Sequence, residues 1–560
     1  MPSRPITPAQ VATWRELFTR GPLPASTEAR TRALRELMQR RAGSVRALID
    51  LHDLVLFALA YPVDATEHAL ATRAMDHVAR EVRRLKRTSG RNAIALANTG
   101  LAHTSVTVAF SHELLSWLQQ RHPDRVSLDS TDGDLEAAKP WLATLLPMAV
   151  RDAFELEDFE LGPWLASMKG KRRPADLGWW LSLTSGLPPA LRAPLFEQLQ
   201  LFATVDLADS GLSSTYGRSP ARALHTFPHG VPRKVDAAAL LRAPLPEARA
   251  LSTAERGQLL DAARGILLCG LRETGPVTHA ERVDLIDLGQ GIDIALFHLP
   301  PQQRQAYDSY IGYVAFLNTV PAAYGGAWMF PGKTKVGVNV FPALRGGASA
   351  LLFAQILRCY AQRYGVDRFE ADPYQLGHGN EDGIASGAYW FYHRLGFMPA
   401  DNATQRVVDR EVKRMAKDRA HRTTPALLRE LAAVPMLLQV NAGPTPIEPV
   451  ELSRAVMKHV SKHHAGDHDA ALRTAMDRLV RALGLSDLAQ WQADERHWAE
   501  QLAPAIDLVP DLERWTAEEK ALLRDLLRAK GGPTEEAYIT LLRGCPRLWK
   551  AWSMAVGASA

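Results

Sequence analysis

Small residues stand between a strand pattern and a helix pattern near the middle of the 560-residue chain. Valines alternate with other residues in Lys335–Phe341, which is strand periodicity, and Pro342 ends the pattern because proline has no N–H for a ladder. Arg345 and Gly346–Ala350 follow, and Ser349 or a neighbour is expected to cap the next helix. N–H groups at a helix start bind anions, and arginine adds a charge-assisted hydrogen bond to phosphate. The pattern therefore predicts a phosphate-binding loop.

Two motifs in this region carry a resemblance to a known family. The stretch V-F-P-A-L-R-G-G-A-S-A, residues 340–350, resembles the pyrophosphate-binding loop of the GNAT acyl-CoA N-acyltransferases. The pattern of that loop is arginine or glutamine, two residues, glycine, one residue, and glycine or alanine; Ala348 replaces its first glycine, which narrows the room for pyrophosphate. Downstream, F-Y-H-R-L-G-F at residues 391–397 is similar to the last helix of the family and the strand after it. The resemblance covers roughly 120 residues.

The resemblance implies that the chain transfers an acyl group from acetyl-CoA or another acyl-CoA to an amine on a small molecule or peptide. In the family, two parallel strands splay apart and the pantetheine arm pairs with strand backbone in the gap. In this sequence the two strands would be Val336–Phe341 and Arg368–Asp372. The residues implied to bind the co-substrate are Val338, Val340, Arg345, Gly346, Gly347, Ala348, Ser349 and Ala350.

Acyl transfer also needs an acid for the departing thiolate. Tyr392 matches the position that often supplies this acid in the family. The reference pKa of a phenol, about 10, is close enough to that of a thiol to hand over a proton during departure. The alternative is that Tyr392 is a half-buried aromatic side chain that packs the last helix.

Four side chains are candidates for the base that takes the amine proton. Glu370 and Asp372 alternate along the second expected strand, so they share one face. His378 has the better reference pKa, and Glu381 is a further candidate; both lie in the polar, glycine-rich insertion Gln375–Ser386, expected at the acceptor end of the cleft. The sequence leaves the choice open, and a carboxylate near the end of a strand is often only solvated.

Strand patterns before the loop form the sheet that must position these groups. They are Val283–Leu288, Ile292–Leu299, Tyr310–Leu317 and Ala327–Phe330, the last two joined by a turn over residues 318–326. A helix over 349–364 is expected to point Leu352, Ile356 and Tyr360 inward and Gln355, Arg358 and Gln362 outward. The fold class predicted is α/β (α+β): a central GNAT-like mixed, mostly antiparallel sheet with splayed parallel strands, flanked by largely α-helical N- and C-terminal domains.

The chain is longer than the chains that usually fold around one hydrophobic core, so we expect three domains. They are a mainly helical domain at 1–250 with a small α/β unit near 91–130, the GNAT-like domain at 251–402, and a helical domain at 403–560. Residues 133–208 are expected to be helical, and residues 209–250 to form an irregular linker or a lid.

Composition narrows the class of protein further. Hydrophobic residues make up 46% and charged residues 23% of the chain, with net charge +5, as in ordinary globular proteins. The apolar runs are too short to span a bilayer and the first residues lack a signal-peptide pattern, so a cytoplasmic protein without a membrane partner is predicted. Cys269, Cys359 and Cys545 suggest neither a disulfide framework nor a zinc site. The histidines at 459–468 have helical spacing but no fixed partners, so no metal is expected.

Two other functions remain open from the sequence. The first is a non-catalytic GNAT-like scaffold that binds nucleic acid or a protein through its basic helical domains, using Arg80–Arg91 or Lys169–Arg173. The second is an acyltransferase that takes its acyl group from aminoacyl-tRNA, although the phosphate loop favours a CoA-type donor. The sequence leaves the acceptor and the oligomeric state open.

Overall fold

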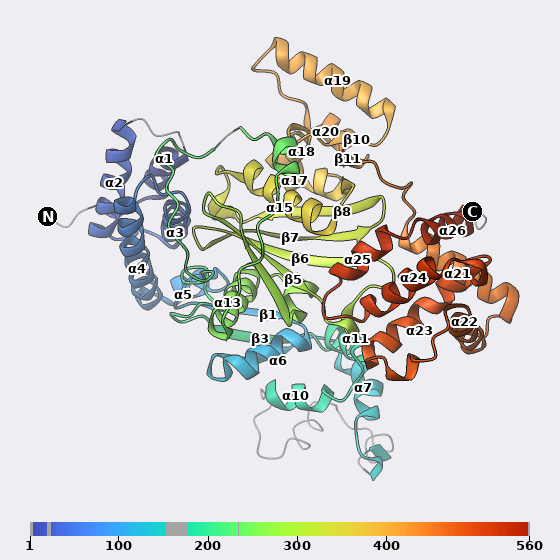
Figure 1. Ribbon diagram of the computed structural model, residues 1–560. Helices are drawn as coiled ribbons and strands as arrows, with labels where there is room; N and C mark the ends of the chain where they lie inside the picture. The colour runs from blue at the N-terminus through green and yellow to red at the C-terminus, as the bar shows by residue number, and fades with distance from the viewer. Residues whose placement is uncertain (1–3, 20–23, 150, 153–176, 233, 558–560) are drawn as a thin grey trace. The chain divides into compact units, whose positions relative to one another are not determined.

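The computed structural model describes residues 4–19, 24–149, 151–152, 177–232 and 234–557 (Figure 1). The chain divides into two compact units. The first comprises residues 1–230, 251–279 and 318–321, and the second comprises residues 231–250, 280–317 and 322–560. The helix at 253–269, which we placed at the start of the acyltransferase domain, therefore belongs to the first unit. The basic cluster Lys169–Arg173 lies outside the described residues.

Helices open the first unit, and the third of them is buried on all sides over residues 54–60. They are α1 (Pro8–Thr19), α2 (Pro24–Gln39), α3 (Val45–Ala60), α4 (Ala65–Thr88) and α5 (Gly90–Leu96). The side chains of Ser44, Asp64 and Ser89 cap α3, α4 and α5, which satisfies N–H groups that a helix cannot pair internally. α4 buries ten residues, so packing rather than propensity holds it in place.

A small antiparallel sheet completes the first unit. Its strands are β1 (Ser105–Ala109), β3 (Leu201–Asp206) and β2 (Val126–Thr131), in that spatial order. The helices around it are α6 (His112–Arg121), α7 (Leu135–Thr144), α10 (Leu177–Thr184), α11 (Pro189–Leu199), α13 (Thr253–Cys269) and α14 (Gly275–His279), with the 3-10 turn η1 (Pro123–Arg125). The expectation that residues 133–208 are helical was wrong for β3. Leu201, Ala203 and Val205 alternate toward the core, so this stretch has strand periodicity.

The second unit is built on a mixed, mostly antiparallel sheet of eight strands flanked by helical regions, which confirms the predicted fold class. The strands are β4 (Arg282–Asp287), β5 (Ile292–His298), β6 (Ser309–Leu317), β7 (Val320–Phe330), β8 (Lys333–Val340), β9 (Arg368–Ala371), β10 (Met398–Pro399) and β11 (Met436–Gln439). Their spatial order is β4-β5-β6-β7-β8-β9-β11-β10. β8 and β9 pair in parallel.

Two strand boundaries differ from the sequence-based expectation. The turn between β6 and β7 is confined to Asn318 and Thr319, both at positive φ, and residues 320–326 belong to β7 rather than to a long turn. Tight two-residue turns with positive φ match the twist of a hairpin. β11 lies in the region 403–560, which we expected to be helical throughout. Its four residues M-L-L-Q are too few to show a strand period.

Helices cover one face of this sheet near the expected loop. After the 3-10 turn η3 (Pro342–Leu344) come α15 (Ser349–Tyr364), α16 (Pro373–Leu376), α17 (Glu381–Ser386) and α18 (Ala388–Arg394). α12 (Ala237–Arg242), from the expected linker, packs against α15. Gln355 and Arg358 are therefore buried, not outward as predicted. Arg358 Nε donates to the carbonyl of Ala243 at 3.2 Å, so these polar side chains have partners under the cover.

Two helices interrupt the sheet before its last strand, and a helical region ends the chain. α19 (Asn402–Lys417) and α20 (Pro425–Ala432) lie between β10 and β11 in the sequence (Figure 1). The C-terminal helices are α21 (Pro449–His464), α22 (His468–Leu483), α23 (Ala493–Asp507), α24 (Ala517–Lys530), α25 (Glu536–Arg543) and α26 (Pro546–Gly557), with 3-10 turns η2 (Pro301–Gln303), η4 (Leu488–Gln490) and η5 (Leu512–Arg514) elsewhere in the unit. None of the helices in the described ranges has the length and apolar character needed to cross a bilayer.

Candidate functional site

The two parallel strands pair only briefly. Thr334 pairs with Phe369 and Lys335 with Glu370. β9 then ends at Ala371, whereas β8 continues to Val340 along its antiparallel partner β7. In the described part of the chain, the other edge of β8 therefore has no strand beside it from Val336 onward. We call this the β8–β9 gap.

Two side chains meet in the β8–β9 gap. Tyr392 of α18 is 2% exposed, and its hydroxyl donates to Gln375 Oε1 at 3.4 Å. The backbone N–H of Val338 lies near enough to this hydroxyl to act on its pKa. Gln375, from α16, also lies over Gly337, where an added Cβ would be only 3.0 Å from its Nε2. Burial raises the pKa of Tyr392 well above its usual range, so the phenol stays protonated at neutral pH and is a weaker acid than the close match with a thiol in the sequence analysis assumed. The gap thus contains a protonated, hydrogen-bonded phenol beside a strand edge.

A second tyrosine reaches the same point from two strands away. The hydroxyl of Tyr313, on β6, donates to the carbonyl of Gly337 at 2.9 Å. It passes over Gly325 of β7, where an added Cβ would lie 2.8 Å from that hydroxyl. Sequence reasoning missed both Tyr313 and Gln375. The signal that could have indicated this place is the glycines at 325, 326 and 337, because glycine inside a strand often marks a close approach of another group.

The predicted phosphate loop follows β8 directly. Gly346 has φ +83°, which favours glycine, and the Gly347 N–H donates to the carbonyl of Leu344 at 3.2 Å. α15 begins at Ser349, with Ala348 at its N-cap and no side-chain cap, so the expected cap from Ser349 or a neighbour was wrong. Arg345 is exposed, and its Nε is 3.4 Å from the carbonyl of Val340. Strand, turn and helix N-terminus are therefore arranged in the predicted order, with Ser349 and Ala350 in the first helical turn.

The candidate bases do not come together as expected. Glu370 is 7% exposed and forms an ion pair with Lys333 at 2.9 Å. Asp372 lies one residue beyond β9, at the N-cap of α16, where its carboxylate accepts from the Tyr374 N–H at 2.9 Å. Asp372 therefore does not share a strand face with Glu370, because Pro373 starts a helix there. His378 is exposed in the turn after α16. Glu370 and Asp372 thus have structural partners.

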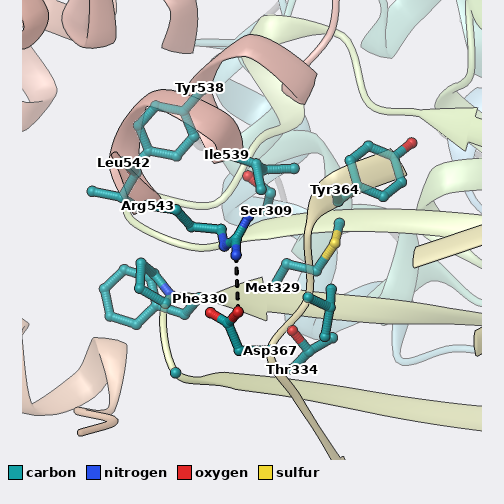
Figure 2. A pocket seen from close by; sticks show the side chains of 13 residues that line it. Ser309, Met329, Phe330, Thr334, Tyr364, Asp367, Tyr538, Ile539, Leu542 and Arg543 are labelled. Carbon is teal, nitrogen blue, oxygen red and sulfur yellow. Dashed lines mark hydrogen bonds and ion pairs between the residues drawn. The ribbon is translucent and has the colours of Figure 1, made fainter. Parts of the chain in front are cut away.

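A separate small pocket lies where β8 begins (Figure 2). Its lining residues are Ser309, Met329, Phe330, Pro331, Gly332, Thr334, Tyr364, Val366, Asp367, Tyr538, Ile539, Leu542 and Arg543. Figure 2 shows the guanidinium of Arg543 directed at the carboxylate of Asp367, at a distance of 2.9 Å. The charges of this pocket neutralise each other, and the predicted site residues take no part in its lining.

No three His, Cys, Asp or Glu side chains are placed to hold a metal ion within the part of the chain that the structure describes. The helical histidines lie near the end of α21. There His459 Nε2 is 3.1 Å from Asp507 Oδ2, and the rings of His459 and His463 are 4.6 Å apart.

Comparison with known proteins returned no match to a family model, a curated protein or a solved structure. The candidate site is therefore argued from the geometry of the second unit and from the motifs that the sequence contains.

Proposed function

We propose that the second unit is an acyl-CoA-dependent N-acyltransferase, with acetyl-CoA or another acyl-CoA entering the β8–β9 gap. The observation that supports this most is the early separation of β8 from β9, which leaves the backbone edge of Val336–Val340 without a strand partner. Such an edge can form main-chain hydrogen bonds with an extended chain that contains amides, as pantetheine does. The edge runs directly into the loop at Arg345 and the N-terminus of α15, which suits a pyrophosphate.

Tyr392 is the proposed acid of the reaction. The acceptor amine attacks the thioester carbonyl, the C–S bond breaks, and the phenol gives its proton to the departing thiolate. The hydroxyl of Tyr392 lies near the Val338 N–H and donates to Gln375 Oε1, which supports a place beside the edge that the thioester would occupy. The amine proton leaves to water or to His378, the exposed candidate base.

Gln375 is the side chain that must move for the donor to bind. It fills the gap between Gly337 and Tyr392, and it sits on a four-residue helix that ends at Gly377, a residue with φ +120°. Short helices followed by glycine are held by few contacts. In this proposal Gln375→Ala raises donor affinity, because the donor no longer displaces a side chain.

Calorimetric titration of the full chain with acetyl-CoA and longer acyl-CoAs tests the proposal. Gly347→Glu should abolish detectable binding, because a carboxylate would face the pyrophosphate. Arg345→Ala should weaken binding about tenfold or more, the loss of a hydrogen bond to a charged group. Arg473→Ala, which removes an exposed charge on α22, is the matched control and should bind like the wild type. A wild-type chain without affinity for any acyl-CoA contradicts the proposal.

Transfer itself is tested with Tyr392→Phe. This variant keeps the ring that packs against Phe353, whose centroid is 5.4 Å away, and removes only the hydroxyl. Donor binding should be retained while turnover with an amine panel falls about 10²-fold or more, as when an acid catalyst is lost. Unchanged turnover would assign Tyr392 to packing.

A further inference from the structure

Helix α19 carries a regular row of exposed cations. We call Arg406, Arg410, Lys413 and Lys417 the α19 stripe. Their spacing of four, three and four residues places them within about 60° of arc on one side of a helix, over a length of about 16 Å. All four side chains are exposed, and none forms a salt bridge in the described part of the chain. Asp401, at the N-cap, acts electrostatically on Arg406.

The opposite side of α19 attaches the helix to the sheet region. Val408 and Glu411 are the buried residues of the helix. Glu411 lies 3.0 Å from His421 Nε2 and accepts from the hydroxyl of Thr423 at 3.0 Å. Trp390 of α18 donates to the same threonine hydroxyl at 3.2 Å. These bonds attach α19 through the side of the helix opposite the α19 stripe.

The packing of α19 does not require four cations on its outer side. Like charges three and four residues apart repel each other along a helix, and Asp409, three residues from Arg406 and four from Lys413, offsets only part of this repulsion. A helix in this place would need polar residues on its outer side, but neutral or mixed charges would serve equally well. Arg414 shows the usual arrangement, because it forms an ion pair with Glu411 at 2.8 Å. The α19 stripe is therefore better explained by a partner outside the chain.

The chemistry of the stripe fits a phosphate backbone better than an acidic protein surface. Its charges follow a straight line at nearly even intervals, as phosphates do, and the arginines can bind phosphate through two parallel hydrogen bonds. Protein interfaces are usually centred on aromatic or large apolar anchors. α19 has no aromatic residue, and Val412, 38% exposed, is its one large apolar side chain in the exposed class. Binding to a nucleic-acid backbone needs no such anchor.

We propose that the α19 stripe binds the phosphate backbone of a nucleic acid without reading its sequence. The inference goes beyond the acyltransferase proposal and does not depend on it. Each cation that contacts a phosphate releases a counterion, so affinity falls steeply with salt. Because Glu411, Thr423 and Trp390 attach α19 through its opposite side, a strand bound to the stripe lies on the outer side of α19.

Fluorescence anisotropy of the full chain with a labelled DNA duplex and a labelled RNA strand, each of about 20 nucleotides in length, tests this. Four phosphate contacts predict a loss of affinity of about 100-fold between about 50 and 200 mM salt. Replacing Arg406, Arg410, Lys413 and Lys417 by alanine should remove most binding at the low salt and reduce the salt slope by about three to four. Arg406→Lys with Arg410→Lys keeps the charges and should keep the slope.

The matched control replaces Arg80, Arg83 and Arg87 of α4 by alanine, another exposed basic row, and should change affinity by less than about threefold. A wild-type chain that binds neither nucleic acid overturns the proposal. So does a stripe variant that is folded by circular dichroism and binds like the wild type, or a poly-glutamate peptide that binds the stripe as tightly as nucleic acid does. The stripe variant should keep its acyl-CoA affinity, so this result is distinct from failure of the acyltransferase proposal.

Discussion

Helices α4 and α19 both expose rows of basic residues, yet they are built differently. α4 buries ten residues, whereas α19 buries Val408 and Glu411. In α4 the buried face includes Glu67, which forms an ion pair with Arg30 of α2 at 2.6 Å, with both side chains at most 1% exposed. In α19 the buried glutamate contacts Thr423 and His421 of the following loop and Arg414 of its own helix.

This difference in packing decides whether a row of basic residues on a helix needs a functional explanation. An amphipathic helix that packs on a core must have a polar outer face, so the arginines of α4 follow from its packing. Lys86 and Arg87 lie in the last turn of α4, where they complement the helix dipole, as Arg414 and Lys417 do in α19. α19 packs on little, and its cations repel each other, so its composition is not a consequence of the core.

Arg30→Ala is the substitution with the largest expected effect on the packed side of this comparison. Glu67 would keep its burial and lose a partner that donates through both Nε and Nη2, as well as the bond from Arg30 to the carbonyl of Tyr61. Breaking a buried pair by removing one partner costs about 3–5 kcal/mol. Denaturant unfolding, with hydrogen exchange of α2–α4 peptides, measures the loss. The double variant with Glu67→Leu should recover most of it, and a loss below about 1 kcal/mol would show that the pair is not desolvated.

Val82 in α4 and Val408 in α19 are both 0% exposed. Replacing each by alanine therefore compares how firmly the two helices are packed. Val82→Ala should destabilise the first unit by about 2 kcal/mol, since two methyl groups are lost and a cavity remains in a rigid core. Val408→Ala should cost about 1 kcal/mol or less, because the thinly covered site can collapse. Hydrogen exchange measured separately for each helix gives the two losses of stability and so their ratio. Equal costs would mean that α19 packs as firmly as α4.

The elements that the sequence predicts well are those with a long, clear period. Strands β4, β5, β6 and β8 and helix α15 were predicted because their apolar residues repeat over six or more positions, or on one helix face, whereas only the last four residues of β7 were predicted. β11 was not predicted because four residues show no period. Its place beside β9 depends on pairing between residues that are far apart in the sequence. Gln355 and Arg358 were misplaced for a similar reason, since the cover over α15 comes from α12.

The residues of the candidate site also divide into those that a local motif predicts and those that only the fold brings together. Local motifs predicted the loop at Arg345–Ala350 and Tyr392, which stand on the expected elements. Gln375 and Tyr313 could not be found, because only the folded sheet brings them to Gly337. Asp372 was misplaced although Asp-Pro is a local signal: an N-cap aspartate followed by proline at the first helical position starts a helix rather than extending a strand.

Glu411 should make the attachment of α19 dependent on pH. Its pKa is lowered from 4.5, first by the hydrogen bond with His421, so the unfolded segment binds more protons than the folded one. The stabilisation is therefore present above about pH 4.5 and is lost as the pH falls through the lower folded pKa. Hydrogen exchange of residues 402–424 should accelerate in that range. Glu411→Ala should open the same segment at neutral pH by about 1–2 kcal/mol and remove the pH dependence.

The smallest expected effect on stability belongs to the α19 stripe. Replacing its four cations by alanine removes several like-charge contacts of about 0.2–0.5 kcal/mol each and introduces a better helix former. The stability of α19 should stay the same or rise by up to about 1 kcal/mol, as read from hydrogen exchange at low salt, and the gain should shrink as salt is added. Arg87 of α4 and Lys417 of α19 both lie in the last turn of their helices, where the dipole favours a cation, so a difference between the two rows should come from the other residues of each row. A clear loss of stability in the stripe variant would mean that these cations serve the fold, and α19 would then be explained as α4 is.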